Sequence, residues 1–350
     1  MSAQRLTARM QASRHDSLQE TVTRDVTEHP RDLSRLYCER FQVSRVTANK
    51  YIQRLEAEGW LARSGPSTHP IYSPGYRRLV GQSYALAGLD EQTPWERDFE
   101  PFFALKPNVR GIVHHGFTEM LNNAIDHSEG QQVYCSMEQT EKRVSLIVVD
   151  DGVGIFDKIT RALGLPDRRL ALLELSKGKL TTDPTRHSGE GVFFTSRMFD
   201  RFSIYANDLQ YAHRADDVHD LLVDDFNAPA QGTGVMMVID LASDRTTKAV
   251  FDAYTSGPDD FTFDKTVVPL KLARLGTEQL VSRSQAKRLI ARFDRFKIVV
   301  LDFEGIDSVG QAFADELFRV YARAHPDIKL EPVHMAPDVA RMVARARAAS

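Results

Sequence analysis

Residues 118–128 read TEMLNNAIDHS, and the chain's architecture can be worked out from this stretch. Apolar residues recur here at helical spacing, which predicts an amphipathic helix. Such a helix places Glu119 and Asn123 one turn apart on the same face. Magnesium keeps several waters and takes few protein ligands, so the Asn123 amide oxygen suits a hydrated Mg²⁺. Glu119 would then stand where it can take a proton from an attacking water.

A second informative stretch, VVDDGVGI, occupies residues 148–155. Apolar residues 144–149 predict a strand that runs into Asp150. A carboxylate at the end of a strand can accept a hydrogen bond from an exocyclic amine. Gly152 and Gly154 would let the backbone bend close to a bound ligand.

Two further glycine-containing stretches follow, HSGEGVFF at 187–194 and QGTGVMMV at 231–238. Gly189 and Gly191 stand just before an apolar helical run, so free N–H groups at the helix start are expected to meet a phosphate. Thr233 precedes a predicted strand and offers a hydroxyl where a base could sit. Taken singly, each stretch also has an ordinary explanation: a hairpin, a helix-surface amide or a strand threonine.

Together, in this order, the four stretches resemble the N box and the three glycine boxes of the GHKL ATPase superfamily, over about residues 95–245. The resemblance implies ATP and Mg²⁺ as cofactors and an α/β sandwich, with a mixed sheet covered by helices on one face. The implied roles are Mg²⁺ ligation by Asn123, a general base at Glu119, adenine contacts at Asp150 and Thr233, a turn under the base at Gly152 and Gly154, and a phosphate loop at Gly189 and Gly191.

About thirty residues between the second and third stretches carry few strand signals, and they include LSKGKLTTDPTRHSG at 175–189. A long loop inside a compact domain is usually a lid or disordered, and a lid is the expectation here. Lys177, Lys179 and Arg186 would supply cations that close on a γ-phosphate. The alternative is that this charged loop is merely solvated.

Composition limits the classes of protein to consider. The chain has 350 residues, 42% hydrophobic and 27% charged, which fits a globular protein with two or three cores. No apolar run approaches the length of a membrane span, and no signal peptide is evident. Cys38 and Cys135 form no ligand pattern, which favours a reduced, cytoplasmic setting.

The first 80 residues are basic and predict a winged helix-turn-helix. Lys and Arg exceed Asp and Glu there by 13 to 8, a balance of +5, whereas the whole chain carries −3. The stretches 31–41 and 46–59 read as helices, and 60–73 reads as a hairpin with Gly65 and Pro66 at its tip. In the second helix, Val46, Ile52 and Leu55 are expected to face the core. A basic end of this kind is where nucleic acid would bind.

The string VSRVTANKYIQRLEAEGWL, at 43–61, resembles the recognition-helix region of GntR-type transcription regulators. This resemblance covers about residues 30–75 and implies DNA as a partner. Asn49 stands where the family often has an arginine, so the family's base preference does not transfer. A winged helix used only for protein contacts is the alternative. The residues implied to approach DNA are Ser44, Arg45, Thr47, Asn49 and Lys50 at the major groove and Arg63 at the backbone.

The last hundred residues alternate between strand and helix patterns in the order βαβαβα, which predicts a small parallel or mixed sheet with helices. Ser282 and Gln285 have the spacing of a capping box. The stretch EGIDSVGQAFADELF, at 304–318, resembles a STAS-like domain of unknown function. In related anti-sigma circuits a serine kinase phosphorylates a serine at this turn, which singles out Ser308. Alternatively, Asp307 or Ser308 simply caps the following helix.

The expected fold class is therefore α+β and multidomain. The predicted parts are a winged helix at 1–80, a linker at 81–94, an ATP-binding domain at 95–245 and a STAS-like domain at 255–350. The expected function is that of a cytoplasmic transcription regulator whose DNA binding is set by ATP. The alternative is a serine kinase or slow ATPase acting on a protein partner or on its own STAS-like domain. A homodimer stays open, and no membrane partner is expected.

Overall fold

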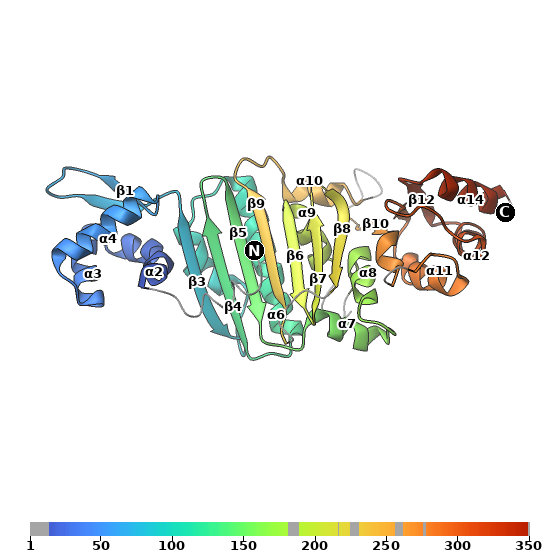
Figure 1. Cartoon of the computed structure of the whole chain (residues 1–350), viewed down its shortest axis with the longest axis horizontal. Helices are drawn as coiled ribbons and strands as arrows, with labels where there is room; N and C mark the ends of the chain where they lie inside the picture. The colour runs from blue at the N-terminus through green and yellow to red at the C-terminus, as the bar shows by residue number, and fades with distance from the viewer. Residues whose placement is uncertain are drawn as a thin grey trace. The chain divides into compact units, whose positions relative to one another are not determined.

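The computed structural model in Figure 1 describes residues 14–180, 189–215, 217–224, 231–255, 262–275 and 278–348. The chain divides into two compact units. One comprises Met1–Val153 with Asn227–Asp244, and the other comprises Gly154–Phe226 with Arg245–Ser350. Within the described ranges, no helix combines the length and the apolar character that crossing a bilayer requires.

From Arg14 onward, the described part of the first unit begins with three helices and a hairpin: α2 (Arg14–Glu28), α3 (Leu33–Phe41), α4 (Arg45–Ala57), β1 (Leu61–Ser64) and β2 (Ile71–Pro74). Val22, Tyr37, Ile52, Leu55 and Trp60 form the centre of their shared core. The sequence predicted α3, α4 and the antiparallel hairpin, and the structure confirms them. It did not predict α2, which fills one side of this core with Val22 and Val26.

One core prediction in this region was wrong. Ile52 and Leu55 are buried as expected, but the Val46 side chain is 68% exposed, and Ala48 occupies the core position instead. Helix α4 begins at Arg45 with Ser44 as its N-cap, so Val46 lies in the first turn. The prediction of which side of α4 faces the core was therefore correct for its second and later turns, but not for its first turn.

The first unit continues with four strands, in the order β3 (Arg78–Ala85), β4 (Gln132–Gln139), β5 (Arg143–Asp150) and β9 (Gly234–Asp240), and neighbours are antiparallel. Helix α6 (Pro107–His127) lies on one face of these strands (Figure 1). Short helical turns lead into α6: α5 (Gln92–Pro94), η2 (Trp95–Phe99) and η3 (Glu100–Phe102). The expected linker at 81–94 is corrected at its start, because residues 81–85 belong to β3 and pair with β4.

The second unit opens with two helices where the sequence predicted a long loop, α7 (Ile155–Leu163) and α8 (Leu170–Lys177). The predicted helix after Gly189 follows as α9 (Gly191–Met198). Next come the antiparallel strands β6 (Arg201–Ala206), β7 (Leu209–Arg214) and β8 (Asp217–Asp224), and later α10 (Thr247–Asp252). Every residue of α8 is buried. A helix that is buried all round lacks the amphipathic pattern from which helices are predicted, which explains the error.

The chain closes with three parallel strands, β10 (Lys265–Pro269), β11 (Ile298–Asp302) and β12 (Lys329–Val333), in that order. Helical segments connect and follow them: η4 (Leu270–Ala273), α11 (Arg283–Ile290), η5 (Phe293–Arg295), α12 (Gln311–Asp315), η6 (Glu316–Tyr321), α13 (Ala322–Ala324) and α14 (Pro337–Ala348). The predicted alternation is confirmed, as is the capping box of Ser282 and Gln285 at the start of α11.

Candidate functional site

Glu119 and Asn123 both lie on α6, one turn apart, and both are half-buried. The Asn123 Nδ2 atom is buried and has no hydrogen-bond partner within the described residues. A buried amide with an unmade hydrogen bond is costly unless something else satisfies it. Helix α6 therefore presents a carboxylate and an amide oxygen, which suit a hydrated cation, and beside them an amide N–H donor that lacks an acceptor.

The end of α6 is tied to the turn that follows β5. The carbonyl of Ser128, the residue after α6, accepts a hydrogen bond from Val153 N at 2.9 Å. Asp151 Oδ1 accepts hydrogen bonds from Gln131 N at 2.7 Å and from Gln132 N at 2.9 Å. The stretches TEMLNNAIDHS and VVDDGVGI are thus joined by the backbone hydrogen bond from Val153 to Ser128, and the Asp151 side chain holds the residues just after α6.

Asp150 is the centre of this turn and is only 9% exposed. Its Oδ1 accepts hydrogen bonds from Gly152 N at 2.9 Å and from Thr233 N at 3.1 Å. The Thr233 side chain also hydrogen bonds to the carboxyl group. Burial raises the pKa of Asp150, and the backbone N–H groups of Gly152 and Thr233 partly oppose that rise. The structure thus brings Asp150, Gly152 and Thr233 together from two separate stretches.

Two glycines make this close approach of backbones feasible. A Cβ added to Gly152 would lie 2.0 Å from the Ser128 carbonyl oxygen, and a Cβ added to Gly232 would lie 2.1 Å from the Asp150 carbonyl oxygen. Gly232 also has φ +83°, a conformation that glycine adopts readily. Any larger residue at either position would push the turn apart. These glycines serve the geometry around Asp150 directly.

In the second unit, Gly154 starts α7 with φ +85°, and a Cβ there would lie 2.4 Å from the side chain of Asn207. Asn207 Oδ1 accepts a hydrogen bond from Asp157 N, and its Nδ2 donates to Asp157 Oδ2, both at 3.1 Å. Asn207 thereby satisfies a free N–H of the first turn of α7 from outside the helix. Sequence analysis did not predict this role for Asn207.

Gly189 and Gly191 lie where the sequence placed them, directly before and at the start of α9. Gly189 has φ +72°, and its carbonyl accepts a hydrogen bond from Leu180 N at 2.9 Å. Among the described residues, no side chain caps the start of α9. N–H groups left free in this way are what a phosphate-binding helix start requires. Arg186, the other predicted contact, lies outside the described residues.

The prediction that Lys177 is an available lid cation was wrong. Its side chain is 0% exposed, with Nζ 2.6 Å from Glu174 Oε1 and 3.0 Å from the carbonyl oxygen of Ala291. Arg292 Nη1 lies 2.8 Å from the other carboxylate oxygen of Glu174. Burial lowers the pKa of Lys177 to about 8, and the attraction of Glu174 opposes that shift. Lys177 is therefore a structural residue that links α8 to the segment after α11.

Lys179 makes a similar link. Its Nζ donates to the Arg295 carbonyl at 2.9 Å, and it lies over the rings of Phe263 and Phe296. Arg295 returns a hydrogen bond of 2.6 Å to the Lys179 carbonyl, and Arg292 donates one of 2.6 Å to the Gly178 carbonyl. The backbone at 178–179, at the end of α8, is thus held by the C-terminal part of the chain.

Of the residues predicted to approach DNA, Arg63 lies on β1 and the others lie on α4 or at its N-cap. Arg45 and Lys50 are exposed, and within the described ranges neither forms an ion pair. Ser44 caps α4 by accepting a hydrogen bond from Thr47 N at 3.3 Å. The other two have partners inside the chain: Asn49 Oδ1 accepts a hydrogen bond of 2.8 Å from Ser34, and Arg63 lies 3.4 Å from Glu56.

Ser308 is exposed in the connection between β11 and α12. The N-cap of α12 is Gly310, and no side chain caps that helix. The alternative in which Asp307 or Ser308 serves as the helix cap was therefore wrong. Within the described residues, the Ser308 hydroxyl therefore has no capping role.

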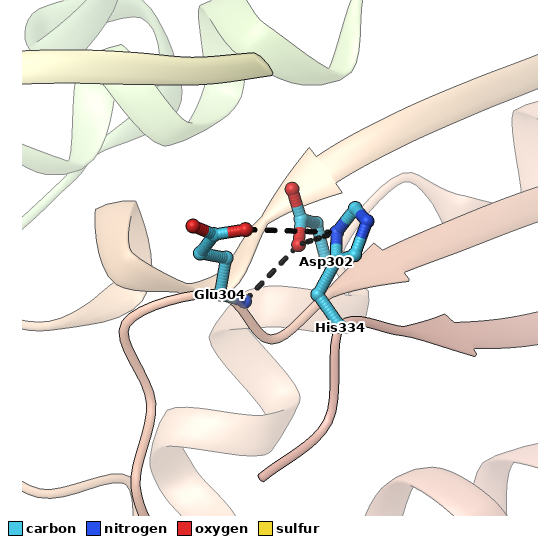
Figure 2. Close-up of side chains that lie close together, drawn as sticks. All are labelled: Asp302, Glu304 and His334. Carbon is cyan, nitrogen blue, oxygen red and sulfur yellow. Dashed lines mark hydrogen bonds and ion pairs between the residues drawn. The ribbon is translucent and has the colours of Figure 1, made fainter. Parts of the chain in front are cut away.

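Sequence analysis missed a cluster of Asp302, Glu304 and His334 at the ends of β11 and β12 (Figure 2). His334 Nδ1 lies 2.9 Å from Asp302 Oδ1 and 4.0 Å from Glu304 Oε2. The hydrogen bond to Asp302 raises the pKa of His334. Asp302 and His334 are 32 positions apart in the sequence. Their proximity could have been predicted only from the expectation that adjacent parallel strands have their carboxyl ends at the same edge of the sheet.

Comparison with protein families matches two parts of the chain. Residues 97–211 match the histidine kinase-like ATPase domain, and residues 285–340 match the STAS-like domain of unknown function. The chain therefore contains both domains. Comparison with curated proteins found no match to the chain. The first match includes the predicted residues from Glu119 to Gly191, while Thr233 and the N-terminal helices lie outside both ranges.

Proposed function

We propose that this protein is a cytoplasmic regulator that binds ATP with Mg²⁺ in its histidine kinase-like ATPase domain and binds DNA through α4 and the β1–β2 hairpin. The observation that carries the proposal is the arrangement of Asp150 at the end of β5. Its buried carboxyl is fixed by two backbone N–H groups and by Thr233. A carboxyl held in this way is preorganised to accept a hydrogen bond from the exocyclic amine of adenine.

The donor set on α6 fits the metal that accompanies ATP. Asn123 would hold the hydrated ion through its amide oxygen, and the unpaired Nδ2 donor of the same amide supports an acceptor, such as a phosphate oxygen, close by. When bound, Mg²⁺ would neutralise charge on the phosphate oxygens. Gly189 and Gly191, at the uncapped start of α9, would supply N–H groups to the phosphates. Arg186 would add a cation there.

The N-terminal helices and hairpin have the order of a winged helix-turn-helix, which supports α4 as the recognition helix. Arg45 and Lys50 supply exposed charge for phosphates and base edges. The exposed Val46 side chain, on the first turn of α4, suits apolar contact with a thymine methyl group. Ser44 fixes that turn by capping it.

Replacing Arg45 or Lys50 with alanine is expected to weaken DNA binding. Each cation that contacts a phosphate contributes about one unit to the magnitude of the slope of log affinity against log salt concentration. The slope of each variant should therefore be smaller in magnitude by about one unit. Fluorescence anisotropy with a labelled duplex over a salt series measures both quantities. Lys248→Ala, which removes an exposed cation of α10, serves as the control and should change neither. Unchanged affinity in both α4 variants would exclude α4 as the recognition helix.

ATP would set DNA binding only if it has different affinity for two states of the protein. The switch is tested by measuring DNA affinity at fixed salt with and without ATP, in the wild type and in Asn123→Ala. If ATP has no effect on either protein, the regulatory part of the proposal fails.

A second candidate function is phosphoryl transfer, which the exposed position of Ser308 favours. In this case, incubation with ATP and Mg²⁺ should label Ser308, and Ser308→Ala should abolish the label. Ser284→Ala, an exposed serine of the same domain, is the matched control. Phosphosite mapping by mass spectrometry tests this function, because an unlabelled Ser308 would exclude phosphoryl transfer to this residue.

If Glu119 is the general base, Glu119→Gln should slow ATP turnover by about 10²- to 10⁴-fold.

A further inference from the structure

The cluster of Asp302, Glu304 and His334 lies where parallel sheets commonly bind ligands, at the carboxyl ends of two adjacent strands. Asp302 is the last residue of β11 and His334 follows the last residue of β12, and the two strands pair in parallel register from Ile298 to Asp302. Ligands of open α/β sheets bind outside the carboxyl ends of the strands. Figure 2 shows the imidazole of His334 and the two carboxylates turned toward one another at this edge.

The spacing of the donor atoms suits one small cation. His334 Nδ1 and Asp302 Oδ1 are 2.9 Å apart, and all three donor atoms lie within 4.8 Å of one another. Ligands about 2.1 Å from a metal ion are separated by about 3 Å when adjacent in an octahedron and by about 3.4 Å in a tetrahedron. The Asp302–His334 pair already has this separation. Only Glu304, whose side chain is 48% exposed, must change its rotamer to complete the set.

The chemistry of the donors selects a class of ion. Imidazole nitrogen favours zinc and other first-row transition metals over Mg²⁺ and Ca²⁺, which prefer oxygen ligands. One nitrogen and two carboxylate oxygens leave the remaining coordination positions open, as in zinc sites that also bind water or a further ligand. The Asp302 carboxylate, which is 2% exposed, accepts one backbone hydrogen bond, from Glu304 N at 3.0 Å. This bond fixes its orientation.

We infer that Asp302, Glu304 and His334 form a binding site for a divalent transition-metal ion, with Zn²⁺ as its representative, in the C-terminal domain. The site is separate from the Mg²⁺ position proposed at Asn123 and does not depend on nucleotide. Asp302 ends β11, and Glu304 lies near the start of the connection that carries Ser308. Metal binding would therefore order the start of that connection.

Isothermal titration of the nucleotide-free full chain with Zn²⁺ tests the site, and absorption of bound Co²⁺ in the visible range reports its ligands. One metal per chain is expected. Loss of an outer partner of a metal ligand already costs about 10- to 100-fold in affinity, so His334→Ala and Glu304→Gln should each lose at least about 100-fold. Glu304→Gln changes an exposed side chain, so this variant keeps the test valid even if His334→Ala folds poorly.

Two controls separate this site from other metal binding. His69→Ala removes an exposed histidine of the N-terminal hairpin and should leave Zn²⁺ affinity unchanged. Asn123→Ala should leave it unchanged as well, because Asn123 belongs to the proposed nucleotide site. The inference is overturned if the wild type takes up no Zn²⁺, or if Glu304→Gln and His334→Ala bind it as tightly as the wild type does.

Discussion

Replacing Glu174 with alanine is expected to lower the free energy of unfolding by about 3–5 kcal/mol, the range found when one partner of a buried ion pair is removed. Glu174 is the anion for two cations, since Lys177 Nζ lies 2.6 Å and Arg292 Nη1 lies 2.8 Å from its carboxylate oxygens. Lys177 is fully buried, so its charge would lose its close anion without becoming exposed to solvent. Chemical denaturation of the wild type and the variant measures the difference.

The pH dependence gives an independent check on this ion-pair network. Burial lowers the pKa of Lys177 from an ordinary value of 10.5 to about 8, so the unfolded chain binds more protons between these values. Stability should therefore rise with pH over that window. In Glu174→Ala the pKa of Lys177 should fall further, which extends the rise toward neutral pH. A variant with the same pH profile as the wild type would contradict the burial of a charged Lys177.

An exposed ion pair provides the matched control. Lys248 and Asp252 form an i, i+4 pair on α10, with side chains that are 75% and 53% exposed. Asp252→Ala should change stability by less than about 0.5 kcal/mol, because solvent screens such pairs. If Glu174→Ala is as mild as Asp252→Ala, the link between α8 and the C-terminal domain is not a major source of stability.

Asp150→Asn is expected to weaken ATP binding by about 30- to 100-fold, equivalent to about 2–3 kcal/mol. Asparagine keeps an oxygen for the N–H groups of Gly152 and Thr233. It replaces the other carboxylate oxygen with an NH₂ group, which cannot accept a hydrogen bond from the adenine amine. The turn should thus persist while the nucleotide contact is lost. Titration with labelled ATP measures the change.

Stability separates loss of binding from loss of fold in this variant. Burial raises the pKa of Asp150, so the ionised carboxyl destabilises the folded state as pH rises through that pKa. At neutral pH Asp150→Asn removes this cost and should unfold no earlier than the wild type. Asp151→Asn is the same substitution one residue later, and Asp151 accepts backbone hydrogen bonds from Gln131 and Gln132 that the asparagine oxygen can still accept. It should bind ATP like the wild type.

Local patterns explain what the sequence predicted well. The capping box at Ser282 and Gln285, the strand ending at Asp150 and the helix carrying Asn123 each depend on residues a few positions apart. The three parallel C-terminal strands followed from regular alternation of strand and helix patterns. The placement of Gly189 before α9 followed from an apolar helical run.

The errors arose where distant residues decide the environment. Lys177 was expected to be a lid cation, but its buried ammonium group donates to the Ala291 carbonyl, more than a hundred positions later in the chain. His334 meets Asp302 only because β11 and β12 pair in parallel. Val46 fits a core pattern, yet it lies in the first turn of α4 and is exposed. In each case tertiary packing overrides the local signal.

Equilibrium binding of labelled ATP to the full chain, with and without Mg²⁺, is the most direct test of the central claim that Asp150 and Asn123 serve one nucleotide site. We expect saturable binding of one ATP per chain that tightens when Mg²⁺ is added, with the Mg²⁺ effect lost in Asn123→Ala. Absence of saturable binding in the wild type, or binding that neither Asp150→Asn nor Asn123→Ala alters, would contradict it.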